Sequence, residues 1–324
     1  MIAVGSTANG VNQTTAPACI LCGSKQLGTY LDGAKQELTS SVLGSSRDKF
    51  DPGKIQRCAV CRFAFSECRP NQEELTGLYR ELDSAVYESE SRGRLTTASR
   101  HLRIVQKYMQ GARLLDVGCA SGIFLNCAAE AGWNVVGVEP AAVLCKKAQQ
   151  LLADRGQVYC SPLQDVDLPS ASFDVVTLWD VLEHVTDPVS FVKRCAGLLR
   201  PSGYLFANVP NIDSLQARLL GGKWPLLLPE HLNYFAQEGL RRCGELASLE
   251  CISFQQRPAS FSIQYVLCRL AQHGIPGTRF CYRLINGTFL GGLCVPVLLG
   301  ETCAVWKRPK IDSSRVRVNL KDKS

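Results

Sequence analysis

The sequence has little of several features that would point at once to a class of protein. Its N-terminal stretch, MIAVGSTANGVNQTTAP, has neither a basic start nor a continuous apolar run, so we expect no secretory signal peptide. The formal net charge is only +7, with several of the charges in the C-terminal tail, which argues against nucleic acid as a partner. Histidine is scarce, at four residues in 324, so few imidazoles are candidates for a catalytic base.

Cysteine is abundant, yet the chain does not resemble a small disulfide-stapled protein. Its 324 residues allow one α/β domain of about 200 residues plus a small appendage. Most of the sixteen cysteines lie inside strand and helix patterns, where cysteine acts as a small apolar residue; examples are Cys119, Cys127, Cys145 and Cys195. We therefore expect a cytoplasmic protein that keeps its thiols reduced.

Two Cys-x-x-Cys pairs, Cys19 with Cys22 and Cys58 with Cys61, begin the organised part of the chain. Two residues between thiolates let both sulfurs reach one tetrahedral Zn²⁺, and Gly23 permits the turn after the first pair. The 35-residue gap between the pairs exceeds the usual gap of about 15 to 20, so we expect a hairpin or loop there. Four thiolates leave no open coordination position, which predicts a structural site; free buried thiols and a redox dithiol are the alternatives.

The rest of the chain is organised around LLDVGCASG, residues 114–122. The apolar residues around Asp116 predict a short buried strand, and a Gly-x-x-x-Gly turn then begins a helix over 123–131. Glycine at 118 and 122 lets backbone N–H groups approach a ligand, because no Cβ intervenes. A second strand over 134–138 ends in Glu139, where an acidic side chain reaches ribose hydroxyls in doubly wound folds. Because the turn is not the Gly-x-Gly-x-x-Gly of dinucleotide enzymes, we expect a nucleoside ligand that lacks a pyrophosphate.

Three motifs in order, LLDVGCASG, VVGVEP and SFDVVTLWDVLEHV, resemble the class I S-adenosylmethionine-dependent methyltransferases over about residues 95 to 260. The resemblance implies an α/β fold with a Rossmann-like, seven-stranded sheet and S-adenosyl-L-methionine as cofactor. It also implies a set of cofactor-binding residues: Asp116, Gly118, Cys119, Gly122 and Glu139, with Gln164 or Asp165 at the adenine and Trp179 and Asp180 at the methionine. The LEHV stretch is similar to ubiquinone-biosynthesis-type O-methyltransferases, and residues 231–235, with the pattern His-Leu-x-x-Phe, are similar to bacterial methyltransferases that act on small molecules. These resemblances imply a small-molecule acceptor such as a sugar, a quinone or another precursor.

Composition and motifs together predict the following division of the chain: a disordered N-terminus over 1–17, a zinc-ribbon-like segment over 18–70, a helical cap over 71–110, a methyltransferase domain over 111–308 and a basic tail over 309–324. The cap should contain helices over 71–82 and 95–110. In the domain we expect helices over 141–153 and 188–199 and strands over 157–160, 173–178 and 204–209. Substrate-cap insertions are expected at 211–235, which is aromatic and bounded by prolines, and at 260–299.

Two apolar runs, 262–270 and 281–299, lie in the second insertion. The longer run contains Asn286, glycines and a proline, and it leads into 300–306, which has the pattern of the last, antiparallel strand of this fold. We therefore expect no transmembrane segment and a helix packed under that strand. Peripheral contact with a membrane surface is the alternative.

The general base is expected among the histidines if the acceptor is a hydroxyl. His184 follows the fourth strand and His231 lies in the aromatic insertion, and an imidazole suits proton removal at neutral pH. We favour His231, although either side chain could instead be structural: His184 could orient its turn, and His231 could anchor the insertion to backbone. Two other functions stay open, an RNA methyltransferase that uses its zinc ribbon and a non-catalytic scaffold of the same fold.

Overall fold

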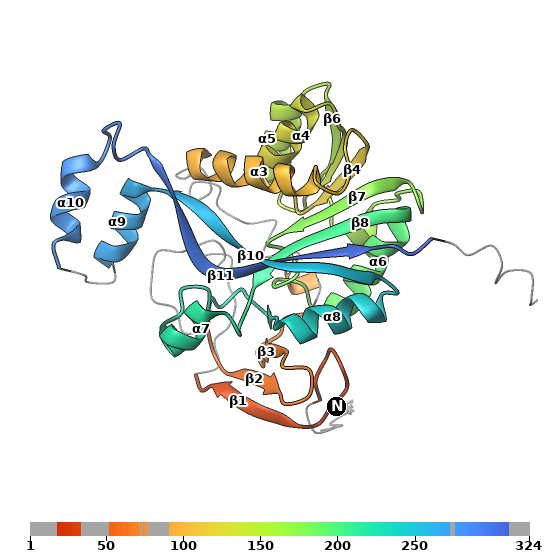
Figure 1. The fold of residues 1–324 in the computed structure, drawn as a ribbon, viewed down its shortest axis with the longest axis horizontal. Helices are drawn as coiled ribbons and strands as arrows, with labels where there is room; N and C mark the ends of the chain where they lie inside the picture. Colours follow the sequence, from red (N-terminus) through yellow and green to blue (C-terminus); the bar gives the residue numbers. More distant parts are fainter. Residues whose placement is uncertain are drawn as a thin grey trace, which may run out of the picture.

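A computed structural model describes residues 18–33, 52–71, 73–75, 77, 91–272 and 276–310. Residues 1–17, most of the expected helix over 71–82, and the tail beyond residue 310 lie outside these ranges. The described parts form a seven-stranded sheet with helices on both faces and a four-stranded sheet beside it, and two further helices stand at one end of the molecule (Figure 1).

The large sheet has the strand order β10-β11-β8-β7-β4-β5-β6. Five strands are parallel to one another: β4 (Arg113–Val117), β5 (Asn134–Val138), β6 (Gly156–Tyr159), β7 (Phe173–Trp179) and β8 (Leu199–Pro210). At the edge, β11 (Cys294–Lys307) runs antiparallel to both β8 and β10 (Glu250–Ser262). The expected Rossmann-like, seven-stranded fold, with its last strand reversed, is confirmed. Because the chain order reverses between β4 and β7, a ligand crevice should lie at their carboxyl ends.

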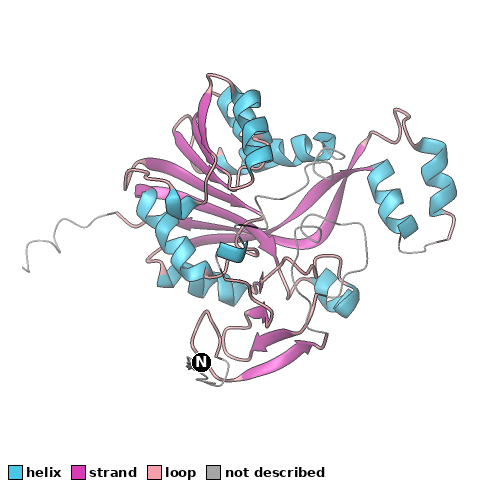
Figure 2. Cartoon of the chain, turned by 180° about the vertical axis from the view of Figure 1, so that it is seen from behind, coloured by secondary structure: helices cyan, strands magenta, loops and turns pink. Residues whose placement is uncertain are grey.

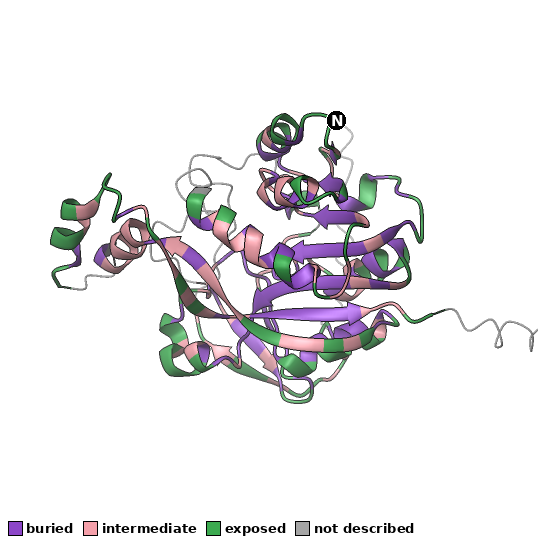
Figure 3. Cartoon of the chain, turned by 45° about the horizontal axis from the view of Figure 1, so that its top comes forward, coloured by how far each residue is buried: buried purple, intermediate pink, exposed green. Residues whose placement is uncertain are grey.

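Helices cover the two faces of this sheet and enclose two apolar cores. One face carries α3 (Ser91–Val105), α4 (Ile123–Glu130) and α5 (Ala142–Leu152), and the other carries α6 (Pro188–Leu198) and α8 (Gln237–Leu246). Between them, Val175, Val176 and Leu178 of β7 have no exposed surface. The central strands are mostly buried in Figure 3, as parallel strands covered on both faces should be.

The predicted elements of this domain agree with the structure to within a few residues, except at the start of β8. The α6 helix begins as local chemistry requires, since the Asp187 carboxylate accepts from the Ser190 N–H at 3.0 Å and Pro188 takes the first helical position. In contrast, β8 begins at Leu199 rather than at residue 204, because Leu199 already pairs with Phe173 of β7. Pairing with a neighbouring strand, which the local sequence does not reveal, sets that boundary.

The small sheet joins the N-terminal segment to the first expected insertion. Its order is β1 (Leu27–Leu31), β2 (Ile55–Cys58), β3 (Ala64–Ser66) and β9 (Asn233–Tyr234). The Phe63 ring lies 5.1 Å from the Phe235 ring, edge to face. Residues 211–235 also contain α7 (Leu215–Leu220) and a 3-10 turn (Gly221–Lys223), and the cysteine-bearing segment packs against this stretch. This contact adds to the expected role of these residues as a substrate cap, which stays a prediction.

The C-terminal part differs from the sequence-based expectation. β10 and β11 continue as a two-stranded ribbon beyond the sheet, and at its tip α9 (Ile263–Gln272) packs against α10 (Thr278–Ile285), as Figures 1 and 2 show. The expectation of a helix under the last strand over 281–299 is wrong, because α10 ends at Ile285 and residues 294–299 belong to β11. Within the described ranges, no helix combines the length and apolarity needed to cross a membrane.

One pair of cysteines departs from the expected free thiols. Cys145, in the buried first turns of α5, forms a disulfide with Cys160, which directly follows β6. The two residues are 15 positions apart and their Cα atoms are 5.5 Å apart, a separation within the range for such bonds. The expectation that Cys145 acts only as an apolar core residue is therefore corrected.

Candidate active site

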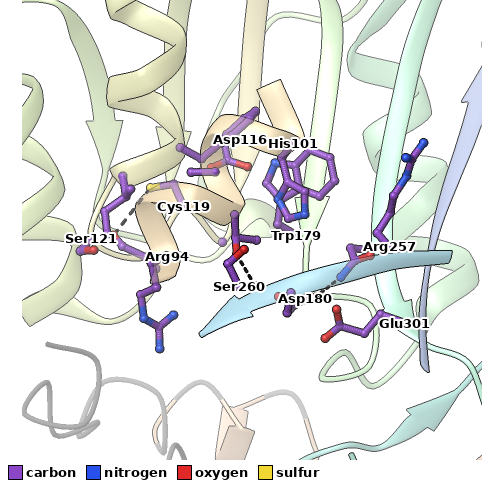
Figure 4. A pocket seen from close by; sticks show the side chains of 18 of the residues that line it. Arg94, His101, Asp116, Cys119, Ser121, Trp179, Asp180, Arg257, Ser260 and Glu301 are labelled. Atoms are coloured by element: carbon purple, nitrogen blue, oxygen red, sulfur yellow. Dashed lines mark hydrogen bonds between the residues drawn. The ribbon is translucent and has the colours of Figure 1, made fainter. Parts of the chain in front are cut away.

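A cavity of about 300 Å³ lies at the carboxyl ends of β4 and β7, where the chain order reverses. One wall is the glycine-rich turn with the first residues of α4, and the opposite wall comes from α3, β10 and β11 (Figure 4). The lining includes five of the residues predicted to bind the cofactor: Asp116, Gly118, Cys119, Trp179 and Asp180. The structure thus brings these five together on one cavity.

Asp116 and Gly118 form the floor of the cavity. Asp116 is 2% exposed and accepts a 2.6 Å hydrogen bond from the Thr177 hydroxyl. Burial raises the pKa of this carboxyl to about 7. Gly118 has a φ of +74°, and a Cβ there would lie 2.7 Å from a methyl group of Val181. Glycine is needed at this position both for the backbone angle and for the close approach of the following turn.

Two aromatic rings form the back of the cavity. The Trp179 indole, at the end of β7, stacks on the His101 imidazole of α3 with 3.8 Å between ring centroids (Figure 4). Burial lowers the pKa of His101 to about 3, so this imidazole is neutral at physiological pH. His101 was not among the residues expected at this site. Its spacing from Arg94 and Ala98, which also line the cavity, is that of one helix face, and this is the only signal that could have found it.

Two carboxyl groups face the cavity beyond Trp179. Asp180, with a left-handed φ of +58°, accepts a 2.8 Å hydrogen bond from the Asn208 amide. Glu301 of β11 lies in the same wall, and the Asn208 side chain contacts it as well. Desolvation, followed by the charge of Asp180, raises the pKa of Glu301 to about 8. A non-glycine residue held in a left-handed conformation beside a carboxyl of perturbed pKa is typical of functional sites.

Two arginines also line this part of the cavity. Arg257 of β10 is the direct cross-strand partner of Glu301, so both side chains lie on the same face of the sheet. Its buried Nε has no hydrogen-bond partner among the described residues. Arg94 of α3 also lines the cavity, and its charge acts on Asp180. This wall therefore combines carboxyl and guanidinium groups, which can bind a polar acceptor and transfer its proton.

The other four predicted cofactor residues lie outside the cavity lining. Gly122 caps α4 with a φ of +79°, and a Cβ there would lie 2.9 Å from the Ala148 Cβ, so it allows close packing of α4 on α5. The Glu139 carboxylate accepts from the N–H groups of Ala120 and Ala141, both at 2.8 Å. Gln164 and Asp165 form a 3-10 turn (Leu163–Asp165), in which Gln164 lines a separate cavity of about 120 Å³.

The two predicted catalytic histidines also lie away from the cavity lining. His184 Nδ1 is 3.1 Å from the Glu230 carbonyl oxygen, and His231 Nδ1 is 2.9 Å from that of Leu226. Since a carbonyl oxygen only accepts, the Nδ1 of each ring carries a proton. Burial lowers the pKa of His184 to about 4 and that of His231 well below its usual value. His231 therefore has the position and protonation of a side chain that binds the insertion to backbone. His184, His231 and Glu183 also offer ligand atoms within 4.8 Å of one another, and these could hold a metal ion.

The four cysteines of the N-terminal segment converge as their spacing predicts. Cys19 Sγ lies 3.5 Å from Cys61 Sγ, and Cys22 Sγ lies 3.6 Å from Cys58 Sγ. A tetrahedral Zn²⁺ with Zn–S bonds of about 2.3 Å would place its sulfurs about 3.8 Å apart. The turns after the two pairs are alike, since Gly23 and Arg62 both have a left-handed φ, at +73° and +60°. The donor set and its geometry fit a four-thiolate zinc site.

A doubly wound sheet in which the last strand is reversed and inserted beside the edge strand, with a glycine-rich turn at the switch point, defines the class I methyltransferase fold. A family model described as a methyltransferase domain matches residues 89–253, just over half of the 324 residues. The chain belongs to this methyltransferase-domain family.

The chain is also similar to curated proteins and solved structures. The chain is 34% identical over 155 residues to a ubiquinone biosynthesis O-methyltransferase of Idiomarina loihiensis, a match that covers 44% of this chain and 63% of that protein. It is 36% identical over 124 residues to the protein of that name from a Bradyrhizobium species, with 36% and 48% covered. A 1,6-didemethyltoxoflavin-N1-methyltransferase of Burkholderia thailandensis, solved with S-adenosylhomocysteine, has a TM-score of 0.47 at 16% identity, with 77% of this chain and 96% of that chain covered.

Proposed function

We propose that this protein transfers a methyl group from S-adenosylmethionine to a small-molecule acceptor bound in the cavity between the glycine-rich turn and β11. The observation that carries the proposal is that one cavity joins Asp116, Gly118 and Cys119 of the turn to Asp180 and Glu301 of the opposite wall. The relatives named above supply an activity for a similar domain. Because the Idiomarina loihiensis match covers 63% of that protein, the acceptor has to be argued from this cavity.

The cofactor would lie along the turn, with its sulfonium toward Trp179 and Asp180. Bound S-adenosylmethionine supplies an activated methyl group, so the protein's main contribution is to align acceptor and methyl. The Glu139 carboxylate holds the N–H of Ala120 at 2.8 Å and so braces the turn; its remaining lone pairs suit ribose hydroxyls. Val181, within contact distance of Gly118, keeps the next loop closed over the turn.

Glu301 is the best candidate for a general base toward a hydroxyl acceptor. A pKa of about 8 matches the working pH better than the lowered pKa values of His184 and His231 do. The hydroxyl proton would pass to the Glu301 carboxylate while the acceptor oxygen forms its bond to the methyl carbon and the carbon–sulfur bond breaks. Asp180 and Arg257 would set the charge around this carboxylate.

The N-terminal segment would hold one structural Zn²⁺ through Cys19, Cys22, Cys58 and Cys61. The Cys61 thiol hydrogen-bonds to Cys19 and lowers the pKa of Cys19, while the same contact raises the pKa of Cys61. The segment contributes to the fold: Arg69 donates to the Leu232 and Thr186 carbonyls at 2.8 and 2.7 Å. Zinc there would hold the cysteine-bearing segment in its packed position against residues 211–235.

The same contacts weigh against RNA as the acceptor. Three of the basic residues in the cysteine-bearing segment bind this chain itself, since Arg57 and Arg62 pair with Asp213 and Arg69 donates to backbone carbonyls. Guanidinium groups that already bind carboxylates or backbone carbonyls of the same chain contribute little to contacts with RNA phosphates. A small-molecule acceptor is the better fit to the cavity.

The test begins with the cofactor. Titration calorimetry with S-adenosylhomocysteine should show binding to the wild-type protein, and a ligand at 100 times its dissociation constant should stabilise the fold by about 2.7 kcal/mol. A panel of phenolic and nucleotide-sugar acceptors, followed by release of S-adenosylhomocysteine, then identifies the substrate. Absence of cofactor binding would support the non-catalytic scaffold, whereas binding with turnover only on RNA would support the RNA enzyme.

A further inference from the structure

The α9–α10 hairpin exposes large apolar side chains to water. On α10, Phe280 is 67% and Leu284 is 62% exposed, and the two lie one helical turn apart. In the turn that leads into β11, Phe289 is 79% and Leu290 is 59% exposed. Figure 3 shows this end of the molecule as largely exposed, in contrast to the buried sheet. Several large apolar side chains exposed on one hairpin indicate an interaction site.

Backbone hydrogen bonds order the turn that carries two of these exposed side chains. In the turn after α10, the N–H groups of Gly292 and Leu293 donate to the carbonyls of Phe289 and Leu290, both at 3.2 Å. The Leu293 carbonyl in turn accepts from the N–H of Ile263 at 2.9 Å, which ties the turn to the start of α9. The exposure of Phe289 and Leu290 therefore belongs to an ordered, hydrogen-bonded turn.

The charge of this region has one sign. Residues 251–300 contain no Asp or Glu, whereas Arg269 lies in α9 and Arg279 and Arg283 lie in α10. Arg279 and Arg283 are exposed and lie beside Phe280 and Leu284 along the helix. Apolar side chains flanked by arginines are the pattern of helices that lie in the headgroup region of anionic membranes, where the guanidinium groups reach the phosphates.

A second copy of the chain fits this surface less well. In a symmetric dimer the same patch faces itself. The arginines of one hairpin would then meet those of the other, with no carboxylate between residues 251 and 300 to balance them. The charge therefore favours an anionic surface over self-association.

We propose that the α9–α10 hairpin docks this protein on the surface of an anionic phospholipid membrane. Phe280, Leu284 and Phe289 would insert among the lipids, and Arg279 and Arg283 would bind the headgroup phosphates. Phe261 and Tyr265 stack at the base of the hairpin with 5.3 Å between ring centroids, and both line the cavity. Docking would thus bring the cavity close to the membrane. The proposal stands on the hairpin alone and holds whether or not methyl transfer occurs.

Flotation of the full chain with phospholipid vesicles tests this docking. Wild-type protein should float with vesicles of phosphatidylcholine containing about 30% phosphatidylglycerol, and less with pure phosphatidylcholine, because each arginine near an anionic surface contributes roughly a fivefold factor. The variant F280S/L284S/F289S should lose at least about tenfold in partitioning to the anionic vesicles. The variant R279Q/R283Q should lose binding to the anionic vesicles and keep its weak binding to neutral ones.

A matched control replaces exposed apolar residues at the other end of the domain. Val143 and Leu151 of α5 are 44% and 40% exposed, so V143S/L151S should float like the wild type. Circular dichroism and melting temperature show whether each variant folds, and all variants keep residues 311–324 unchanged. The proposal is overturned if the wild type does not float, if F280S/L284S/F289S floats as well as the wild type, or if the control loses as much as it does. Sedimentation that shows a dimer which the triple variant abolishes, without vesicle binding, would assign the surface to a second copy.

Discussion

The two walls of the cavity are built in different ways. The wall proposed for the cofactor comes from one continuous stretch, in which β4, the glycine-rich turn and α4 follow each other over residues 113–130. The acceptor wall is assembled from α3, the end of β7, β10 and β11, so that Arg94 and Glu301 face one cavity from opposite ends of the domain sequence. The first wall is encoded as a local motif, whereas the second depends on strand pairing across the sheet.

We expect the largest loss of stability from a change in a third region, the cysteine-bearing segment, which lines neither wall of the cavity. Removal of zinc, or Cys61→Ser, should unfold the small sheet, because the metal would supply most of its stability. The loss should spread to β9, which belongs to that sheet. Metal analysis and hydrogen exchange at residues 211–235 measure this, with Cys68→Ser, at a cysteine outside the cluster, as the control. Protein purified without chelator that contains no metal would contradict the zinc site.

The next largest effect is a loss of turnover, which tells whether the general base is Glu301 of the acceptor wall or a buried histidine. Glu301→Gln should lower turnover by roughly 10²- to 10⁴-fold, the usual contribution of a general base, and should leave S-adenosylhomocysteine affinity nearly unchanged. His231→Gln removes a buried ring whose Nδ1 bonds the Leu226 carbonyl, so it should lower the melting temperature and leave turnover of the folded protein close to wild type. The reverse pattern would restore His231 as the base.

Glu139→Ala tests the cofactor wall. The carboxylate holds two backbone N–H groups at 2.8 Å in addition to its expected ribose contacts. Hydrogen bonds to a charged group contribute about 1.5 to 3 kcal/mol each, so S-adenosylhomocysteine affinity should fall by a few kcal/mol. Calorimetry gives this value, and Glu130→Ala, at an exposed residue on the far end of α4, is the control. Unchanged affinity would remove Glu139 from the site.

The smallest expected effect is a dependence of stability on pH. Asp116 and Glu301 have pKa values of about 7 and 8 in the folded protein, above the ordinary values of 3.8 and 4.5. These two carboxyls therefore bind more protons in the folded state than in the unfolded state. The lowered pKa values of His101, His184 and His231 act in the opposite direction below about pH 6.5, so stability should fall as pH rises from about 7 to 8. Urea unfolding at several pH values measures the slope, which Glu301→Gln should reduce. A stability that rises from about pH 7 to 8 in wild type and variant alike would contradict these pKa shifts.

The success of prediction from sequence follows the same division between local and distant structure. The strands and helices around LLDVGCASG were found because their apolar patterns and turn glycines are local signals, and the cysteine pairs because their spacing is itself geometric information. Glu301 was missed because its role depends on the register that sets it opposite Arg257 and Pro210. His101 was missed because a helix face reveals its partner only after α3 packs on the end of β7. The contact of residues 211–235 with β3 was missed because an aromatic, proline-bounded stretch is compatible both with a substrate cap and with packing on another segment.

The central claim is that Glu301 takes the proton of the acceptor. Once an acceptor has been identified, the pH dependence of kcat/KM for wild type and Glu301→Gln tests this claim most directly. If Glu301 takes the acceptor proton, wild-type activity should rise with pH with a midpoint near 8, the pKa of this carboxyl in the free protein. The variant should show a low activity without that rise. An unchanged pH midpoint and turnover in Glu301→Gln would contradict the account and remove the acceptor wall from the chemistry.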